Sequence, residues 1–256
     1  MEVSLEIVPR AISPLQKDAE LCRFYPAINS INVPDLPRFS IRSWEGCAAV
    51  RAAGIDPNIT LIPHLRARDF SLNEPFPLTD FFRDQGIRRA LVIAGDPEPG
   101  RSDDGFESST IGLIKKIRAE LPELEVYTAF DPYRTNIRFE LDYLAAKEAA
   151  GAVGFMSQPF FDLRLLEIYA EFLEGKKVFW GTSPVLTKGN QRYWESRNRA
   201  VFPRSFRPDL AWNTSFAREL MNFCLQNGFN LYFMPINLDL KTYLAGIWPA
   251  SEKREG

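Results

Sequence analysis

The sequence predicts a (β/α)8 barrel (TIM barrel), and three observations lead to this prediction. Short apolar runs rich in β-branched and aromatic residues alternate with helical patterns along the whole chain. Eight such pairs fit within 256 residues, which matches the size and period of this barrel. No linker, internal repeat or low-complexity tract breaks the alternation. We therefore expect a single domain over residues 1–250 and a polar tail at 251–256.

The expected strands are short, and several follow a glycine that ends the preceding helix. Strands are expected at residues 3–8, 27–33, 59–63, 90–94, 125–129, 152–157, 177–181 and 230–234. Helices are expected at residues 15–23, 41–53, 78–85, 109–120, 137–150, 162–174, 212–227 and 238–245. The helix over 162–174 has clear end signals, because Asp162 can cap its first turn and Gly175 follows it. Other helices end in the same way, at Gly54, Gly86, Gly151 and Gly228.

One long segment, 182–208, interrupts the alternation after the seventh strand. It contains six Arg or Lys residues and no apolar period, so we interpret it as an extended loop. Loops that follow the strands of a barrel build its active site. A doubly wound open sheet is the alternative fold. Its first strand–helix turn would normally carry a glycine fingerprint, which this chain lacks.

The composition argues against several classes of function. The chain has 31 Lys and Arg against 33 Asp and Glu, without the basic excess that nucleic-acid binding needs. No apolar run of about 18 residues is present, so we expect no membrane partner. The first residues lack the basic and apolar parts of a secretory signal. Three widely spaced cysteines form no disulfide framework, which indicates reduced thiols and a cytoplasmic location.

The chain contains a single histidine, His64. A histidine-rich zinc site cannot be assembled, and we expect no metal. The motifs HExxH, GxSxG, GxGxxG and GxxxxGK[ST] are all absent from the sequence. Acid–base chemistry is then left to carboxylates, lysine and tyrosine. His64 lies at the end of the third strand, where it is either a structural hydrogen-bonding group or a ligand contact.

The end of the first strand offers a general acid. Alternation places Glu6 on the same face as Ser4 and Val8, and that face can be the barrel interior. A carboxyl group surrounded by apolar side chains has a raised pKa and can keep its proton at neutral pH. The alternatives are a surface carboxylate and a carboxylate paired with an arginine of a neighbouring strand.

Two further strand ends carry polar side chains. The fourth strand stops at Gly95-Asp96, where Asp96 is either a reactive carboxylate or a turn cap. The sixth strand ends at Gln158, and Phe160 and Phe161 follow it. An amide among aromatic rings suits a flat heterocycle, although both phenylalanines are equally compatible with the core.

These strand ends together resemble the 5,10-methylenetetrahydrofolate reductase family. Five short motifs occur in the expected order and at the expected barrel positions. They are residues 4–9, Pro63-His64-Leu65, Gly95-Asp96 with Pro99-Gly100, residues 147–152, and Gln158 with residues 160–162. The match covers residues 3–162 and is looser afterwards, through Gly181, residues 183–185 and Asn237.

The resemblance implies a barrel that reduces methylenetetrahydrofolate to methyltetrahydrofolate with NADH or NADPH. It implies that Glu6 protonates the bridging nitrogen and that Asp96 tunes charge near the pterin. It also implies that Gln158 hydrogen-bonds the pterin, and that Phe160 and Asn237 lie on the substrate side. The expected partners are therefore a tetrahydrofolate-type pterin and a nicotinamide dinucleotide, with a homo-oligomer or an auxiliary subunit as further possibilities.

The cofactor is the point at which this chain departs from the family pattern. Flavin-binding members usually have an arginine where this chain has Ala94, and a Thr-Tyr-Gly motif where it has Asn32-Val33-Pro34. His64 and Lys147 are retained at flavin-contacting positions, and Asn32 falls at another cofactor position. Binding of FAD and direct transfer of hydride from the nicotinamide both remain open.

Two other functions fit the same resemblance. The substitutions at Ala94 and Asn32 suit a non-catalytic, folate- or flavin-binding subunit of a one-carbon enzyme complex. Retention of Glu6 speaks against that reading, because a carboxylate in an apolar pocket is costly to keep. Methyl transfer is the least favoured reaction, since the sequence lacks cobalamin and zinc motifs.

Overall fold

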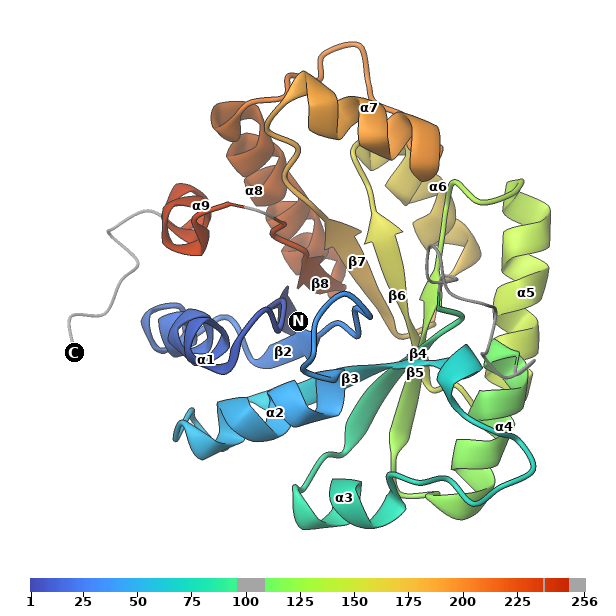
Figure 1. Cartoon of the computed structure of the whole chain (residues 1–256). Helices are drawn as coiled ribbons and strands as arrows, with labels where there is room; N and C mark the ends of the chain where they lie inside the picture. Colours follow the sequence, from blue (N-terminus) through green and yellow to red (C-terminus); the bar gives the residue numbers. More distant parts are fainter. Residues whose placement is uncertain (96–108, 237, 249–256) are drawn as a thin grey trace.

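The computed structural model describes residues 1–95, 109–236 and 238–248. Its eight described strands form a closed barrel in chain order, β1 to β8, and every neighbouring pair is parallel. The predicted barrel is therefore confirmed, and the open sheet is wrong. Figure 1 shows the strands at the centre with the helices outside them. The expected tail at 251–256 lies outside the described residues.

All eight predicted strands are present within the described residues. They are β1 Val3–Glu6, β2 Ser30–Val33, β3 Thr60–Arg66, β4 Arg89–Ile93, β5 Glu125–Phe130, β6 Gly154–Pro159, β7 Val178–Thr182 and β8 Asn230–Phe233. β3 runs three residues beyond its predicted end, so His64 lies within the strand rather than after it. Apart from such shifts at the ends, the alternation of apolar runs locates the strands correctly.

The eight predicted helices also form, with small shifts of their ends. They are α1 Ile12–Glu20, α2 Ser43–Ala52, α3 Thr79–Asp84, α4 Thr110–Glu120, α5 Ile137–Ala149, α6 Leu163–Phe172, α8 Leu210–Asn227 and α9 Leu240–Ile247. The Asp162 side chain caps α6 by accepting a hydrogen bond from the Arg164 N–H. Gly228 ends α8 in the left-handed conformation, with φ of 67°, which glycine adopts without strain. Two short 3-10 turns, η1 Leu21–Phe24 and η2 Ala67–Asp69, follow α1 and β3.

The segment 182–208 is not wholly an extended loop, because it contains the helix α7, Lys188–Arg197. Thr187 caps this helix by accepting a hydrogen bond from the Asn190 N–H. Trp194 is its one buried residue, and the Trp194 ring packs against Phe161 with centroids 5.6 Å apart. A helix that buries a single side chain has no apolar period, which explains the wrong prediction. Figure 1 shows α7 near α6 and α8.

The core has two layers, separated by the strands. Side chains that point inward fill the barrel with a compact cluster of Ile62, Leu91, Tyr127, Met156, Phe179, Tyr232 and Met234. Side chains that point outward pack beneath the helices and form the larger cluster. Paired residues of neighbouring parallel strands point to the same side of the sheet. The register therefore identifies which polar residues share the interior with the inner cluster.

Candidate active site

Glu6 lies at the carboxyl end of β1, on the inward face of the barrel. The register pairs Glu6 with Asn32 of β2, and pairs Ser4 with Ser30 of β2 and Tyr232 of β8. Because Tyr232 belongs to the inner cluster, Ser4 and Glu6 face the interior as well. The carboxyl end is also where barrel enzymes hold their reacting groups.

The Glu6 carboxyl group accepts a hydrogen bond from the Tyr232 hydroxyl through its Oε2 atom. Burial raises the pKa of Glu6 to about 7, and the hydrogen bond from Tyr232 partly opposes that rise. Burial also raises the pKa of Tyr232 well above its usual value, and the nearby Glu6 adds to this effect. Tyr232 therefore keeps its proton, while Glu6 can hold and release one near neutral pH.

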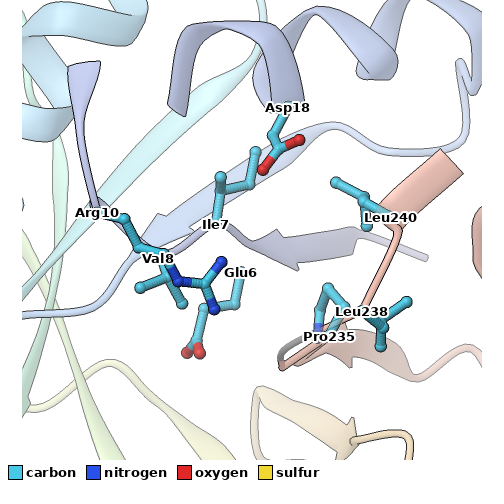
Figure 2. Close-up of a pocket in the computed structure, with 8 residues that line it drawn as sticks. All are labelled: Glu6, Ile7, Val8, Arg10, Asp18, Pro235, Leu238 and Leu240. Atoms are coloured by element: carbon cyan, nitrogen blue, oxygen red, sulfur yellow. The ribbon is translucent and has the colours of Figure 1, made fainter. Parts of the chain in front are cut away.

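A pocket opens beside Glu6, between the end of β1 and the connection from β8 to α9. Its lining combines charged side chains with apolar ones: Glu6, Ile7, Val8, Arg10, Asp18, Pro235, Leu238 and Leu240. In Figure 2 Asp18 projects from α1 on one side of the pocket, and Leu238 and Leu240 lie on another. Glu6, which is half-buried, thus lies at the edge of a small hollow in the surface.

A second chain of polar side chains crosses the interior from β1 to β3. Asn32 donates a hydrogen bond from Nδ2 to the Ser4 hydroxyl at 2.5 Å, and its Oδ1 lies 3.1 Å from His64 Nε2. Burial lowers the pKa of His64 to about 3, so the imidazole is neutral at physiological pH. With Asn32 oriented in this way, His64 carries its proton on Nε2 and donates it to the amide oxygen. This chain orders the interior next to Glu6.

Lys147 is buried between α5 and β5. Its Nζ atom donates a hydrogen bond to the Ala129 carbonyl oxygen at 2.5 Å and lies 4.1 Å from the centre of the Tyr143 ring. Burial lowers the pKa of Lys147 to about 8, and the neighbouring Glu140 carboxylate opposes that shift. Glu140 in turn accepts a hydrogen bond from Arg134 at 2.6 Å. Lys147 thus belongs to a charged cluster that joins α5 to the end of β5.

Gln158 and Phe160 differ in their surroundings. Gln158 is half-buried near the end of β6, at a break in the β6–β7 register between Met156 and Pro159. Phe160 is fully buried in the outer layer of the core. Its ring centroid lies 6.1 Å from that of Phe130 and 5.7 Å from that of Trp180. The structure therefore brings Glu6, Asn32 and His64 together but places Phe160 among core aromatics.

Asp96 and Asn237 lie outside the described residues, so their expected roles stay predictions. Tyr232 is a candidate that the sequence analysis missed. A signal was present, because alternation along β8 puts Tyr232 and Met234 on the same face. A tyrosine in an apolar strand is ordinarily read as core, and its contact with Glu6 depends on barrel closure between β8 and β1.

A second missed cluster lies after β2 and β3. Arg42 donates hydrogen bonds to Asp35 at 2.7 Å and to Asp69 at 2.5 Å. Burial raises the pKa of Asp35 to about 6, although Arg42 opposes the rise. This ion pair fastens the β2–α2 connection to η2 and so shapes the rim of the site. Among the described residues, no group of three or more potential metal ligands comes together.

The side chains at the expected flavin positions form hydrogen bonds within the protein. Asn32 and His64 are hydrogen-bonded to each other, and Lys147 donates to the Ala129 carbonyl group. All three are buried, with Lys147 only 2% exposed. These hydrogen bonds hold the three side chains in place within the protein.

The comparisons with known sequences agree on one family. A family model described as methylenetetrahydrofolate reductase matches residues 45–188, which is more than half of the chain. The 5,10-methylenetetrahydrofolate reductase of Buchnera aphidicola subsp. Schizaphis graminum is 30% identical over 115 residues. That stretch is 44% of this chain and 38% of the relative, so the match spans well under two thirds of the relative's length.

Similar solved structures share the fold at low sequence identity. The carboxyl transferase domain of Rhizobium etli pyruvate carboxylase, solved with pyruvate, is 12% identical with a TM-score of 0.54. The alignment covers 92% of this chain and 40% of that one. A 2,3-dimethylmalate lyase of the PEP mutase/isocitrate lyase superfamily is 11% identical with a TM-score of 0.52. It covers 98% of this chain and 89% of the lyase. At these identities the likeness supports the barrel alone.

Among the described helices, none has the length and apolar character that crossing a bilayer requires.

Proposed function

The chain belongs to the methylenetetrahydrofolate reductase family, and we propose that it reduces 5,10-methylenetetrahydrofolate to 5-methyltetrahydrofolate with NADH or NADPH. One observation carries the proposal: the inward-facing Glu6 is hydrogen-bonded to Tyr232 beside an open pocket, and its pKa is about 7. A carboxyl group with that pKa suits general acid catalysis at neutral pH.

In the proposed reaction Glu6 transfers its proton to one of the two nitrogens that hold the methylene bridge. The bond between that nitrogen and the bridging carbon breaks, and its electron pair stays on the nitrogen. The other nitrogen then shares its lone pair with the carbon and forms an iminium ion. Hydride from the reduced nicotinamide adds to this carbon and gives the methyl group. The reaction consumes one NADH or NADPH and one proton, and solvent reprotonates Glu6.

Apolar surroundings support this role in two ways. They raise the pKa of Glu6, which keeps the acid protonated before the reaction. They also shield the iminium carbon from water, which would otherwise compete with hydride. Ile7, Val8 and Leu240 line the same pocket as Glu6 with apolar side chains.

We propose that hydride passes directly from the nicotinamide to the substrate. The support is that Asn32, His64 and Lys147, at the expected flavin positions, are buried and bonded within the protein. The sequence lacks the arginine that flavin-binding members usually carry at the position of Ala94. We retain the cytoplasm as the proposed location, because Cys22, Cys47 and Cys224 are free thiols. Whether the chain forms a homo-oligomer or needs an auxiliary subunit stays a prediction.

The experiment is oxidation of NADH and of NADPH by methylenetetrahydrofolate under anaerobic conditions. The protein is first stripped of any bound pigment, and each assay is run with and without added FAD. Turnover without FAD supports both the reductase and direct transfer. Turnover only with FAD keeps the reductase and contradicts direct transfer. No turnover in any arm, with folate binding retained, favours the non-catalytic subunit.

For Gln158→Ala, we expect folate binding to weaken about 3- to 10-fold, with a smaller change for the nicotinamide. The reason is the loss of one neutral hydrogen bond to the pterin, which contributes about 0.5–1.5 kcal/mol. Titrations of each ligand alone measure both affinities, and Gln191→Ala on α7, where the side-chain amide donates a hydrogen bond to Glu195 of the same helix, is the control. If the variant loses affinity equally for the folate and for the nicotinamide, the proposed contact between Gln158 and the pterin is contradicted.

A further inference from the structure

Tyr232 is placed against Glu6 by the closure of the barrel. β8 is the last strand of the barrel and pairs with β1, and the register sets Tyr232 beside Ser4. The Tyr232 side chain is 3% exposed, and its hydroxyl donates a hydrogen bond to Glu6 Oε2. Two residues 226 positions apart in the sequence thus form one partly buried pair.

We propose that Tyr232 is a positioning residue that fixes the orientation of the Glu6 carboxyl group and determines which of its oxygens delivers the proton. The hydroxyl donates to Oε2, so in the protonated acid Oε2 is the carbonyl oxygen and the proton lies on Oε1. After transfer, the same hydrogen bond contacts a carboxylate and becomes charge-assisted, which strengthens it. This inference rests on the proposed function only for its consequence in turnover.

Other charged and titratable groups also lie around Glu6, besides Tyr232. Arg10, which follows β1, and Asp18 of α1 line the same pocket. On the side of β2 and β3, His64 is hydrogen-bonded to Asn32, and burial lowers the pKa of His64 so that it is neutral. The pKa of Glu6 is set by burial and by the hydrogen bond from Tyr232. Arg10 lines the pocket as a cation, but the group that lowers the pKa of Glu6 is the Tyr232 hydroxyl.

Tyr232→Phe removes the hydroxyl and keeps the buried ring. We expect the pKa of Glu6 to rise by about one to two pH units, because a hydrogen bond to the charged form is lost. The kcat at pH 7 should fall about tenfold or more, since the acid is weaker and no longer held in one orientation. The fall of kcat at high pH should begin at a higher pH in Tyr232→Phe than in the parent, by the same shift of about one to two pH units.

The matched control is Tyr243→Phe on α9. Tyr243 is also fully buried, and its hydroxyl has no hydrogen-bond partner among the described residues. Its ring packs against Phe233 of β8, with centroids 6.3 Å apart. This variant should leave both the pKa of Glu6 and the pH profile unchanged.

Two measurements test the proposal. The first is a titration of the Glu6 carboxyl carbon by NMR in protein with 13C-labelled glutamate, assigned through Glu6→Gln. The second is the pH dependence of kcat in the two tyrosine variants and in the double variant Tyr232→Phe/Glu6→Gln. The proposal is supported if the pKa of Glu6 rises in Tyr232→Phe but not in Tyr243→Phe. It also requires that the double variant turns over no more slowly than Glu6→Gln alone.

Failure of the proposal and failure of the proposed function give different results. A raised pKa in Tyr232→Phe without turnover in the parent supports the pairing and contradicts the reductase. Turnover in the parent with an unchanged pKa in Tyr232→Phe contradicts the positioning role. An equal shift in Tyr243→Phe also contradicts it, because loss of any buried hydroxyl would then suffice. If Tyr232→Phe does not fold, the Tyr232 hydroxyl proton of the parent is observed by NMR: a downfield resonance that shifts in Glu6→Gln supports the pairing, and a resonance that Glu6→Gln leaves unchanged overturns it.

Discussion

Glu6→Gln should lower kcat roughly 100-fold or more while the protein stays folded. Glutamine has nearly the size of glutamate and can still accept the hydrogen bond from Tyr232 through its amide oxygen. It cannot release a proton to the nitrogen of the substrate, so the methylene bridge stays closed and hydride has no iminium to attack. Steady-state kinetics at pH 7 measure the loss, and circular dichroism and thermal unfolding confirm the fold.

The matched control is Glu167→Gln, on the exposed face of α6. It removes the same charge far from the strand ends and should leave kcat within about twofold of the parent. The KM for the folate should change little in Glu6→Gln, because the proton is used in the transition state rather than in binding. If Glu6→Gln turns over like the parent, another residue is the acid and the assignment of Glu6 fails.

Phe160→Ala should lower the free energy of unfolding by about 3–5 kcal/mol, the range measured for large-to-small changes in cores. Phe160 is fully buried in an aromatic cluster whose ring centroids lie 5.7 to 6.4 Å from its own. Removing the ring leaves a cavity between the strands and α6, which the rigid barrel cannot close. Denaturant unfolding of the parent and of the variant measures the difference.

Two further variants separate packing from substrate contact. Phe139→Ala removes a ring that is 65% exposed on α5 and should change stability by less than about 0.5 kcal/mol. Phe160→Leu keeps an apolar side chain and should recover most of the stability and a KM near that of the parent. A large rise in KM for Phe160→Ala at unchanged stability would instead place its ring against the folate, as the family resemblance implies.

Much of the fold could be predicted because barrel strands and helices leave simple patterns. A strand that is buried on both faces has several consecutive apolar residues. Glycines such as Gly228 mark the ends of helices. The helix α7 could not be predicted in this way. It buries only Trp194, so packing against Phe161 stabilises it without an apolar stripe.

The site was predictable only in part, because contacts between strands decide it. Alternation along β1 grouped Glu6 with Ser4 and left open which face they share, and the pairing of β1 with β8 shows that it is the inward face. Its contact with Tyr232 depends on barrel closure, which joins the first strand to the last. The break in register after Met156 alters which side chains near the end of β6 face inward, so alternation could not separate Gln158 from Phe160. Likewise, the resemblance to the family could not show that Lys147 donates a hydrogen bond to the Ala129 carbonyl oxygen.

The most direct test follows one hydrogen atom from the nicotinamide to the product. NADH or NADPH deuterated at both C4 positions is mixed with methylenetetrahydrofolate and pigment-free protein in ordinary water, without oxygen and without FAD. Mass spectrometry then reads the methyl group of the product after one turnover. We expect methyltetrahydrofolate that carries one deuterium, because hydride passes directly between the two substrates. Product that forms only with added FAD and has lost the label to water would contradict direct transfer, and no product with either nucleotide would contradict the reductase itself.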